Sequence, residues 1–170
     1  MKIREDFVTN SSSSSFILAF DTEKDYLRFS ENCAWLGYEK FETLIDKGMK
    51  QKSIEEHKKS AGELLHRYFE REKYFNYLIA EKFGNESKTQ NHNYLLICEY
   101  EKSEEYKLKL ESFLAKDEDY NDKLNRVNNA ENIVEMMIWD TSGGILEWAI
   151  RNGFLESEFE QYLVLCWNIG

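Results

Sequence analysis

The residues best placed to do chemistry stand in one short stretch, Asp140-Thr-Ser-Gly-Gly144, which follows an apolar run. A carboxylate, two hydroxyls and free backbone N–H groups at the carboxyl end of a strand form a common ligand-binding arrangement in α/β sheets. Asp140, Thr141 and Ser142 are therefore the candidate catalytic residues, with Glu135 or a histidine as proton carrier. Capping of a following helix by one of the three is the simpler interpretation, and we favour it.

The same stretch superficially resembles the apolar-Asp-Thr-Gly signature of aspartic proteases. It departs from that signature because Ser142 separates Thr141 from Gly143. The chain also holds no second copy, so a dimer would have to provide the pair of aspartates.

Histidines and carboxylates give little sign of a metal site. Glu63-x-x-His66 has the spacing of a carboxylate-bridged di-iron helix, but that chemistry needs two such pairs and two further glutamates, and the sequence holds one pair. His57 stands nine residues from His66, and His92 lies alone between two asparagines. Phosphate-loop, dinucleotide, nucleophile-elbow and zinc-protease motifs are absent from the sequence. We expect neither a metal nor a cofactor.

Five consecutive serines, Ser11, Ser12, Ser13, Ser14 and Ser15, form the second candidate site. They could serve as a hydroxyl-rich recognition strip or as a phosphorylation target. With no Gly or Lys beside them they do not form a phosphate-cradling loop. From the residues alone, the serines indicate a flexible polar lead into the strand that follows.

A resemblance to other proteins favours a recognition role for these serines over a merely flexible lead. The string Ile3-Arg-Glu-Asp-Phe-Val-Thr-Asn-Ser11, continued by Ser12 to Ile17, resembles the opening R-x-D-F-V-T-N-S-S-S-S-S-F-I of a set of uncharacterised, clostridial-type bacterial proteins. It covers about a tenth of the chain, and the bodies that follow this opening look unrelated to one another. The resemblance implies a portable module that is recognised in trans or cleaved. It implies no activity, and it leaves residues 20–170 unexplained.

The elements that must position these residues are short strands separated by helices. We predict strands over residues 15–20, 94–100 and 133–139, with a fourth over 161–168 that also fits helical spacing. The expected fold is α+β, with a small mixed sheet of three or four strands and helices mostly on one face.

The longest predicted helix runs over residues 53–83. Ser53-Ile-Glu-Glu56 has the form of a capping box, apolar residues follow at helical spacing, and Gly84-Asn85 ends the pattern. The helix is either a continuous spine or breaks near 60–62. Further helices are expected over about 22–48, 103–115 and 145–151, and a mobile surface segment is expected over 116–132.

Length and composition limit the number of domains and the cellular compartment. We predict that the 170 residues form a single domain with a Ser-rich segment over 1–15. Cys33, Cys98 and Cys166 are widely spaced and indicate free thiols in a reducing compartment. No signal peptide or membrane span is evident, so we expect a cytoplasmic protein that does not enter a membrane.

The net charge of −10 disfavours nucleic acid and anionic membranes as partners and favours a protein partner. Residues 131–170 hold seven acidic side chains and one basic one, Arg151. The first hypothesis is a non-catalytic interaction protein with a portable amino-terminal recognition segment. The alternatives are an acidic inhibitor or immunity-type protein that binds a basic partner, and a small hydrolase or transferase with a site near Asp140. The oligomeric state stays open.

Overall fold

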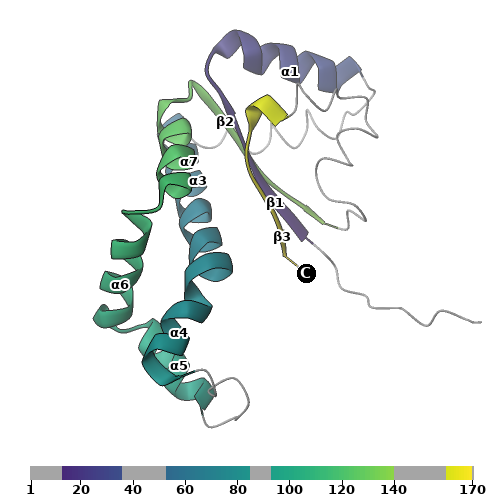
Figure 1. Ribbon diagram of the computed structural model, residues 1–170. Coiled ribbons are helices and arrows are strands. Elements are labelled where there is room, and N and C mark those ends of the chain that lie inside the picture. The colour runs from purple at the N-terminus through teal and green to yellow at the C-terminus, as the bar shows by residue number, and fades with distance from the viewer. Residues whose placement is uncertain (1–12, 36–52, 85–92, 140–159, 170) are drawn as a thin grey trace, which may run out of the picture. The chain divides into compact units, whose positions relative to one another are not determined.

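The computed structural model of the chain describes residues 13–35, 53–84, 93–139 and 160–169 (Figure 1). The chain divides into two compact units. We call residues 1–57 and 130–170 the strand unit, and residues 58–129 the helical unit. The α+β class is confirmed. The single domain predicted from length stays a prediction.

The strand unit is built on a three-stranded sheet with β1 (Ser13–Phe20) in the centre, between β2 (Asn132–Trp139) and β3 (Leu163–Ile169). Strands predicted over 15–20, 133–139 and 161–168 are thereby confirmed. Both pairings are antiparallel, so the described strands show no parallel pairing of the kind that a mixed sheet implies. A register shift after Ile17 marks a bulge between β1 and β3.

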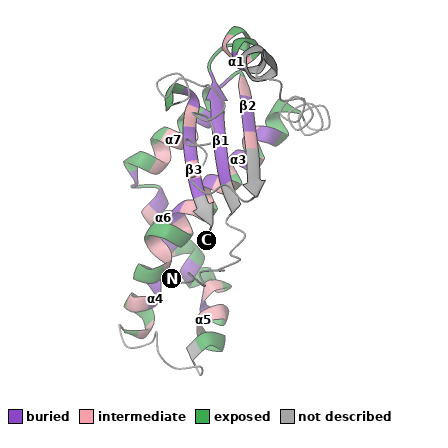
Figure 2. Cartoon of the chain, turned by 90° about the vertical axis from the view of Figure 1, so that its right-hand side faces the viewer, coloured by how far each residue is buried: buried purple, intermediate pink, exposed green. Residues whose placement is uncertain are grey.

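The centre of the sheet is the core of this unit. Phe16, Ile17, Leu18 and Phe20 are fully buried along β1 (Figure 2). This follows from the sequence, because an uninterrupted apolar run fits a strand with both faces covered. Burying each large apolar side chain contributes about 1.5–3 kcal/mol.

Helix α1 (Glu23–Trp35) follows β1 and packs against Phe20, at the end of that strand. Thr22 caps the helix: its hydroxyl oxygen accepts from the Asp25 amide at 3.1 Å and donates to the Asp25 carboxylate at 2.8 Å. The Phe20 ring packs on Phe29 and Tyr162, with ring centroids 5.2 Å and 4.7 Å apart. The part of the predicted 22–48 helix beyond residue 35 lies outside the described residues, as does the whole helix predicted over 145–151.

The long predicted helix is confirmed as α3 (Ile54–Phe69), η1 (Glu70–Tyr74) and α4 (Phe75–Phe83) in unbroken succession. The capping box forms as predicted: Ser53 N–H donates to the Glu56 carboxylate at 2.7 Å, and the Ser53 hydroxyl accepts from Glu56 N–H at 3.3 Å. The helix ends at Gly84, whose φ of 82° suits a residue without a side chain.

The alternative of a break near 60–62 is wrong, because α3 runs through Gly62. A Cβ added there would meet Leu124 at 3.7 Å, an ordinary contact. The irregularity lies further on, where Glu70–Tyr74 forms one π-helical turn. Such turns are rare and frequently occur at functional sites.

The strand predicted over 94–100 is wrong: these residues form helix α5 (Asn93–Glu101). A short apolar run fits a buried strand and a helix equally well, so periodicity alone does not separate the two. In the folded chain Tyr100 packs edge-on against Phe83 and Tyr106, which holds this helix against α4 and α6 (Glu104–Leu114). The helix predicted over 103–115 is confirmed by α6.

The mobile segment predicted over 116–132 is also wrong. Helix α7 (Glu118–Asn129) occupies most of it, and Val127 is fully buried. Asp117 caps this helix, accepting from the Tyr120 amide at 3.1 Å. The polar composition of this segment was the reason for expecting a loop. A helix that packs on a neighbour can nevertheless form when its first turn is capped and a few of its apolar side chains are buried.

Cys98 and Cys166 are free thiols and half-buried. None of the described helices is both long and apolar enough to span a membrane.

Candidate functional site

The predicted catalytic residues Asp140, Thr141 and Ser142 lie outside the described residues. Their proposed proton carrier, Glu135, lies within β2, four residues before the end of the strand at Trp139.

Glu135 instead meets a histidine. Its carboxylate oxygen Oε1 lies 3.5 Å from Nδ1 of His57, which stands in the first turn of α3. The two side chains are only 14 % and 8 % exposed. Neither ring nitrogen of His57 has a hydrogen-bond partner among the described residues.

This buried pair links the first turn of α3 to β2. It is poorly placed to act on a substrate, since so little of either side chain is exposed. Glu135 or a histidine was predicted as the proton carrier, but their contact with each other was not predicted. Glu135 lies directly opposite the buried Ile17 in the strand pairing, which explains the low exposure of this carboxylate.

The serine run is divided by the fold. Ser13, Ser14 and Ser15 belong to β1 and pair with both neighbouring strands. Ser15 is 2 % exposed. Ser11 and Ser12 lie outside the described residues. An enzyme that modifies a serine needs access to its hydroxyl, so Ser15 is a poor modification site in the folded protein.

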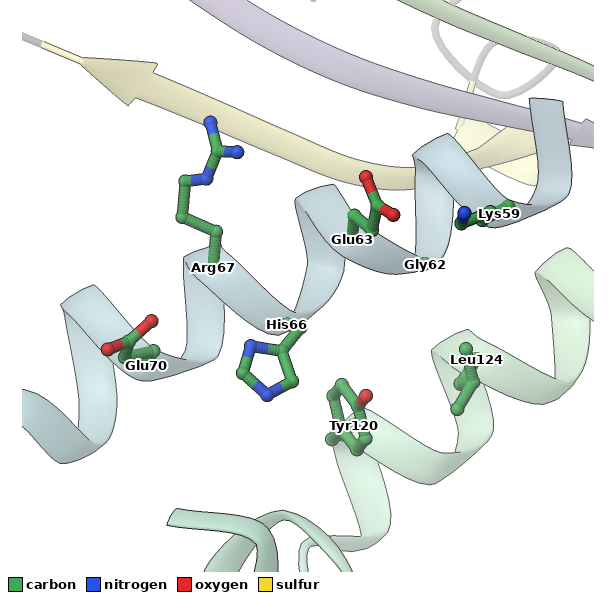
Figure 3. A pocket seen from close by; sticks show the side chains of 8 residues that line it. All are labelled: Lys59, Gly62, Glu63, His66, Arg67, Glu70, Tyr120 and Leu124. Carbon is green, nitrogen blue, oxygen red and sulfur yellow. The ribbon is translucent and has the colours of Figure 1, made fainter. Parts of the chain in front are cut away.

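A groove lies between α3 and α7 in the helical unit (Figure 3). We call it the α3–α7 groove. Its volume is about 490 Å³, and it is lined by Lys59, Gly62, Glu63, His66, Arg67, Glu70, Tyr120 and Leu124. Figure 3 shows His66, Tyr120 and Leu124 in the space between the two helices. The spacing of Glu63 and His66 marks this pair in the sequence, but the groove was not predicted, because residues 116–132 were expected to form a mobile segment and not the helix that completes it.

Hydrogen bonds fix two of the lining side chains. His66 Nε2 lies 3.0 Å from the Glu111 carboxylate, and Glu70 accepts from the Tyr106 hydroxyl at 2.9 Å. Burial, helped by the charge of Glu111, raises the pKa of Tyr120, so its hydroxyl stays protonated at neutral pH. The side chains of Lys59, Glu63 and Arg67 form no hydrogen bond or ion pair among the described residues. Figure 3 shows Glu63 and Arg67 on the side of α3 away from Tyr120 and Leu124.

Asp117 is the most heavily bonded buried carboxylate described. Its side chain, 3 % exposed, accepts from Lys73 Nζ at 2.5 Å and from the Tyr74 hydroxyl. Burial alone would raise the pKa of Asp117, but hydrogen bonds from Lys73, Tyr74 and the Tyr120 amide together hold it below its usual value. Lys73 and Tyr74 belong to the π-helical turn, so that turn serves here to aim two side chains at the cap of α7.

In the described part of the chain, no three His, Cys, Asp or Glu side chains come together as a metal site would require. Within the Glu63-x-x-His66 motif, His66 pairs with the Glu111 carboxylate.

The chain matches no protein-family model, no curated protein and no solved structure.

Proposed function

We propose that this protein is a non-catalytic interaction protein that binds a protein partner through its strand unit and the amino-terminal segment that leads into it. The carrying observation is the division of charge between the two units. Residues 1–57 and 130–170 hold 18 acidic and nine basic side chains, a net charge of −9. Residues 58–129 hold 14 acidic and 13 basic side chains, a net charge of −1.

This difference in net charge favours recognition of a partner by the strand unit over recognition by the helical unit. A concentrated charge attracts an oppositely charged partner over several ångströms and raises the rate of association. In the helical unit, by contrast, many charges are satisfied internally, as in the pairs Lys82–Glu105, Arg71–Glu101 and Lys109–Glu81. The helical unit therefore supplies less net charge for steering.

The fold also limits which residues of the amino-terminal string a partner can contact. Residues 13–17 of the resembling string lie in the central strand, with Phe16 and Ile17 fully buried. Cleavage after Ser15 would remove three residues from that strand. We therefore propose that a partner of the folded protein reads residues before Ser13.

The test is deletion of residues 2–12, which spares β1. We expect the shortened chain to keep its circular dichroism spectrum and to lose the partner that co-purifies with the full chain from its native host. A control chain carries the same residues 2–12 in scrambled order. Undiminished recovery of the same partner by both altered chains would refute a recognition role for the opening.

The charge of the strand unit favours a second candidate, an acidic inhibitor or immunity-type protein that neutralises a basic partner. Asp21 and Glu160 are exposed acidic residues of this unit. The double variant Asp21→Lys, Glu160→Lys should bind such a partner at least about tenfold more weakly. Glu99→Lys, Asp122→Lys makes the same charge change in the helical unit and should leave binding within about threefold. Equal losses in the two double variants would contradict this candidate.

A further inference from the structure

We propose that two copies of the chain associate through helix α5 and form a weak, concentration-dependent homodimer. Figures 1 and 2 both show α5 beside α4 at one end of the helical unit. The contact lies wholly within that unit, and it is independent of the partner proposed for the strand unit.

Helix α5 is apolar on every side. Six of its nine residues are apolar: Tyr94, Leu95, Leu96, Ile97, Cys98 and Tyr100. A helix of such a composition is as a rule buried all round. Of these six side chains only Tyr100 is buried, where it packs against Phe83 and Tyr106. One side of the helix therefore packs inside the unit, and the other sides keep apolar side chains in contact with water.

The exposed side chains of α5 are large and consecutive. Tyr94, Leu95 and Leu96 are 69 %, 70 % and 50 % exposed. Single exposed apolar residues are normal on a protein surface, whereas a contiguous group commonly marks an interaction site. Tyr94 and Leu95 stand four and three residues before Cys98, so these three side chains share one face of the helix. A hydrogen bond with the Cys98 thiol raises the pKa of Tyr94, in agreement with that shared face.

The charge of the helical unit favours a second copy over a basic partner as the occupant of this face. The net charge is −1 in this unit and −9 in the strand unit. A basic partner gains little attraction from a nearly neutral surface, whereas two helical units meet with little net repulsion. Charges near α5 are also paired within the unit, as in Arg71–Glu101 and Lys82–Glu105. Helix α5 thus offers an apolar surface, and a second copy offers the same.

The exposed area of α5 sets the strength of the association. Tyr94, Leu95 and Leu96 together offer on the order of 300 Å² per copy, because full burial removes roughly 150–250 Å² of a tyrosine and roughly 100 Å² of a leucine from water. A standard stable interface buries about 800 Å² per partner. We therefore expect a dissociation constant between about 10 μM and about 1 mM. Identical faces related by a two-fold axis close at two copies, so no larger assembly should form.

The experiment is sedimentation equilibrium of the full chain between about 1 μM and about 2 mM. The average mass should equal that of one chain at the low end and rise with concentration toward that of two chains. A mass that stays at one chain over the whole range would overturn the proposal. Growth past two chains would overturn it too, because it would show open-ended aggregation in place of a closed pair.

Paired variants test whether the contact lies on α5. Leu95→Glu places a charge in the apolar face and should weaken dimerisation at least about tenfold, and Leu95→Ala should weaken it about threefold without adding a charge. Leu108→Glu makes the same change at an equally exposed leucine of α6 that stands singly between two lysines, and it should stay within about threefold of wild type. Circular dichroism checks that the variants keep their helices. Equal weakening by the two glutamate variants, or none by either substitution of Leu95, would overturn the proposal.

Discussion

Two buried polar groups behave in opposite ways at the scale of single residues. Asp117 accepts three hydrogen bonds, whereas the ring nitrogens of His57 have none among the described residues. A satisfied buried carboxylate stabilises the fold, and an unsatisfied buried polar group costs free energy. Substitutions at the two positions should therefore have different consequences.

Replacing Asp117 should destabilise the protein. Asp117→Asn removes the charge that Lys73 and Tyr74 address and weakens the cap of α7, for a loss of about 2 kcal/mol in the free energy of unfolding at pH 7. Urea unfolding followed by circular dichroism measures this loss. Asp122→Asn, at an exposed position of α7, should change it by no more than about 0.5 kcal/mol.

The pH dependence of that loss has a definite sign. The pKa of Asp117 is lower in the folded chain than its ordinary value of 3.8. Its contribution to stability is therefore fully present above pH 3.8 and disappears as the pH falls through the folded value. The difference between wild type and Asp117→Asn should stay constant from neutral pH to about pH 5 and shrink at lower pH. A difference that grows with acidification would contradict this account of the hydrogen bonds.

Replacing His57 with an apolar residue should cost little. His57→Leu removes two buried nitrogens without hydrogen-bond partners and keeps most of the volume, so the free energy of unfolding should fall by less than about 0.5 kcal/mol or rise. His57→Asn, which keeps a polar group and leaves a gap, should be clearly less stable than His57→Leu in the same urea titration. A loss above about 2 kcal/mol in His57→Leu would mean that the pair with Glu135 is a required interaction.

At the scale of elements, the buried side chains of the central strand β1 form the core of the strand unit. Leu18→Ala leaves a cavity in a fully buried position and should lower the free energy of unfolding by about 3 kcal/mol. Leu108, which is 69 % exposed on α6, provides the control: Leu108→Ala should change stability by less than about 0.5 kcal/mol. Similar effects of the two substitutions in thermal melts would argue against β1 as the central strand.

The sequence predicted those elements whose signals do not depend on distant contacts. The Ser53 capping box and the glycine at position 84 located both ends of the long helix, and uninterrupted apolar runs located all three strands. The prediction failed for α5 and α7 for different reasons. In α5 the apolar run lacks a helical period, and in α7 a cap at Asp117 with one buried valine outweighs a polar composition.

The candidate sites were harder to predict than the elements. Local sequence pointed to Glu63, His66 and Glu135, but it could not pair His66 with Glu111 or Glu135 with His57, because those partners are 45 and 78 residues away. Such pairings depend on how helices and strands pack. The α3–α7 groove was missed for the same reason, since half of it belongs to a helix that was not predicted.

At the scale of the whole molecule, the division of charge has a measurable consequence. If the strand unit steers a basic partner, the association rate should fall at least about tenfold between about 50 mM and about 500 mM salt, with a smaller change in the dissociation rate. Surface plasmon resonance with the co-purified partner measures both rates. An association rate that does not change with salt would contradict steering by the net charge of −9 in this unit.

The central claim, that the protein works by binding a protein partner, is tested most directly by native mass spectrometry of the full chain purified from its own host. We predict a complex of the intact chain with one other protein in fixed proportion, and we predict that the chain lacking residues 2–12 no longer forms this complex. Recovery of the intact, unmodified chain with no second protein would contradict the account, and the Asp140 region would then be the place to look for an activity.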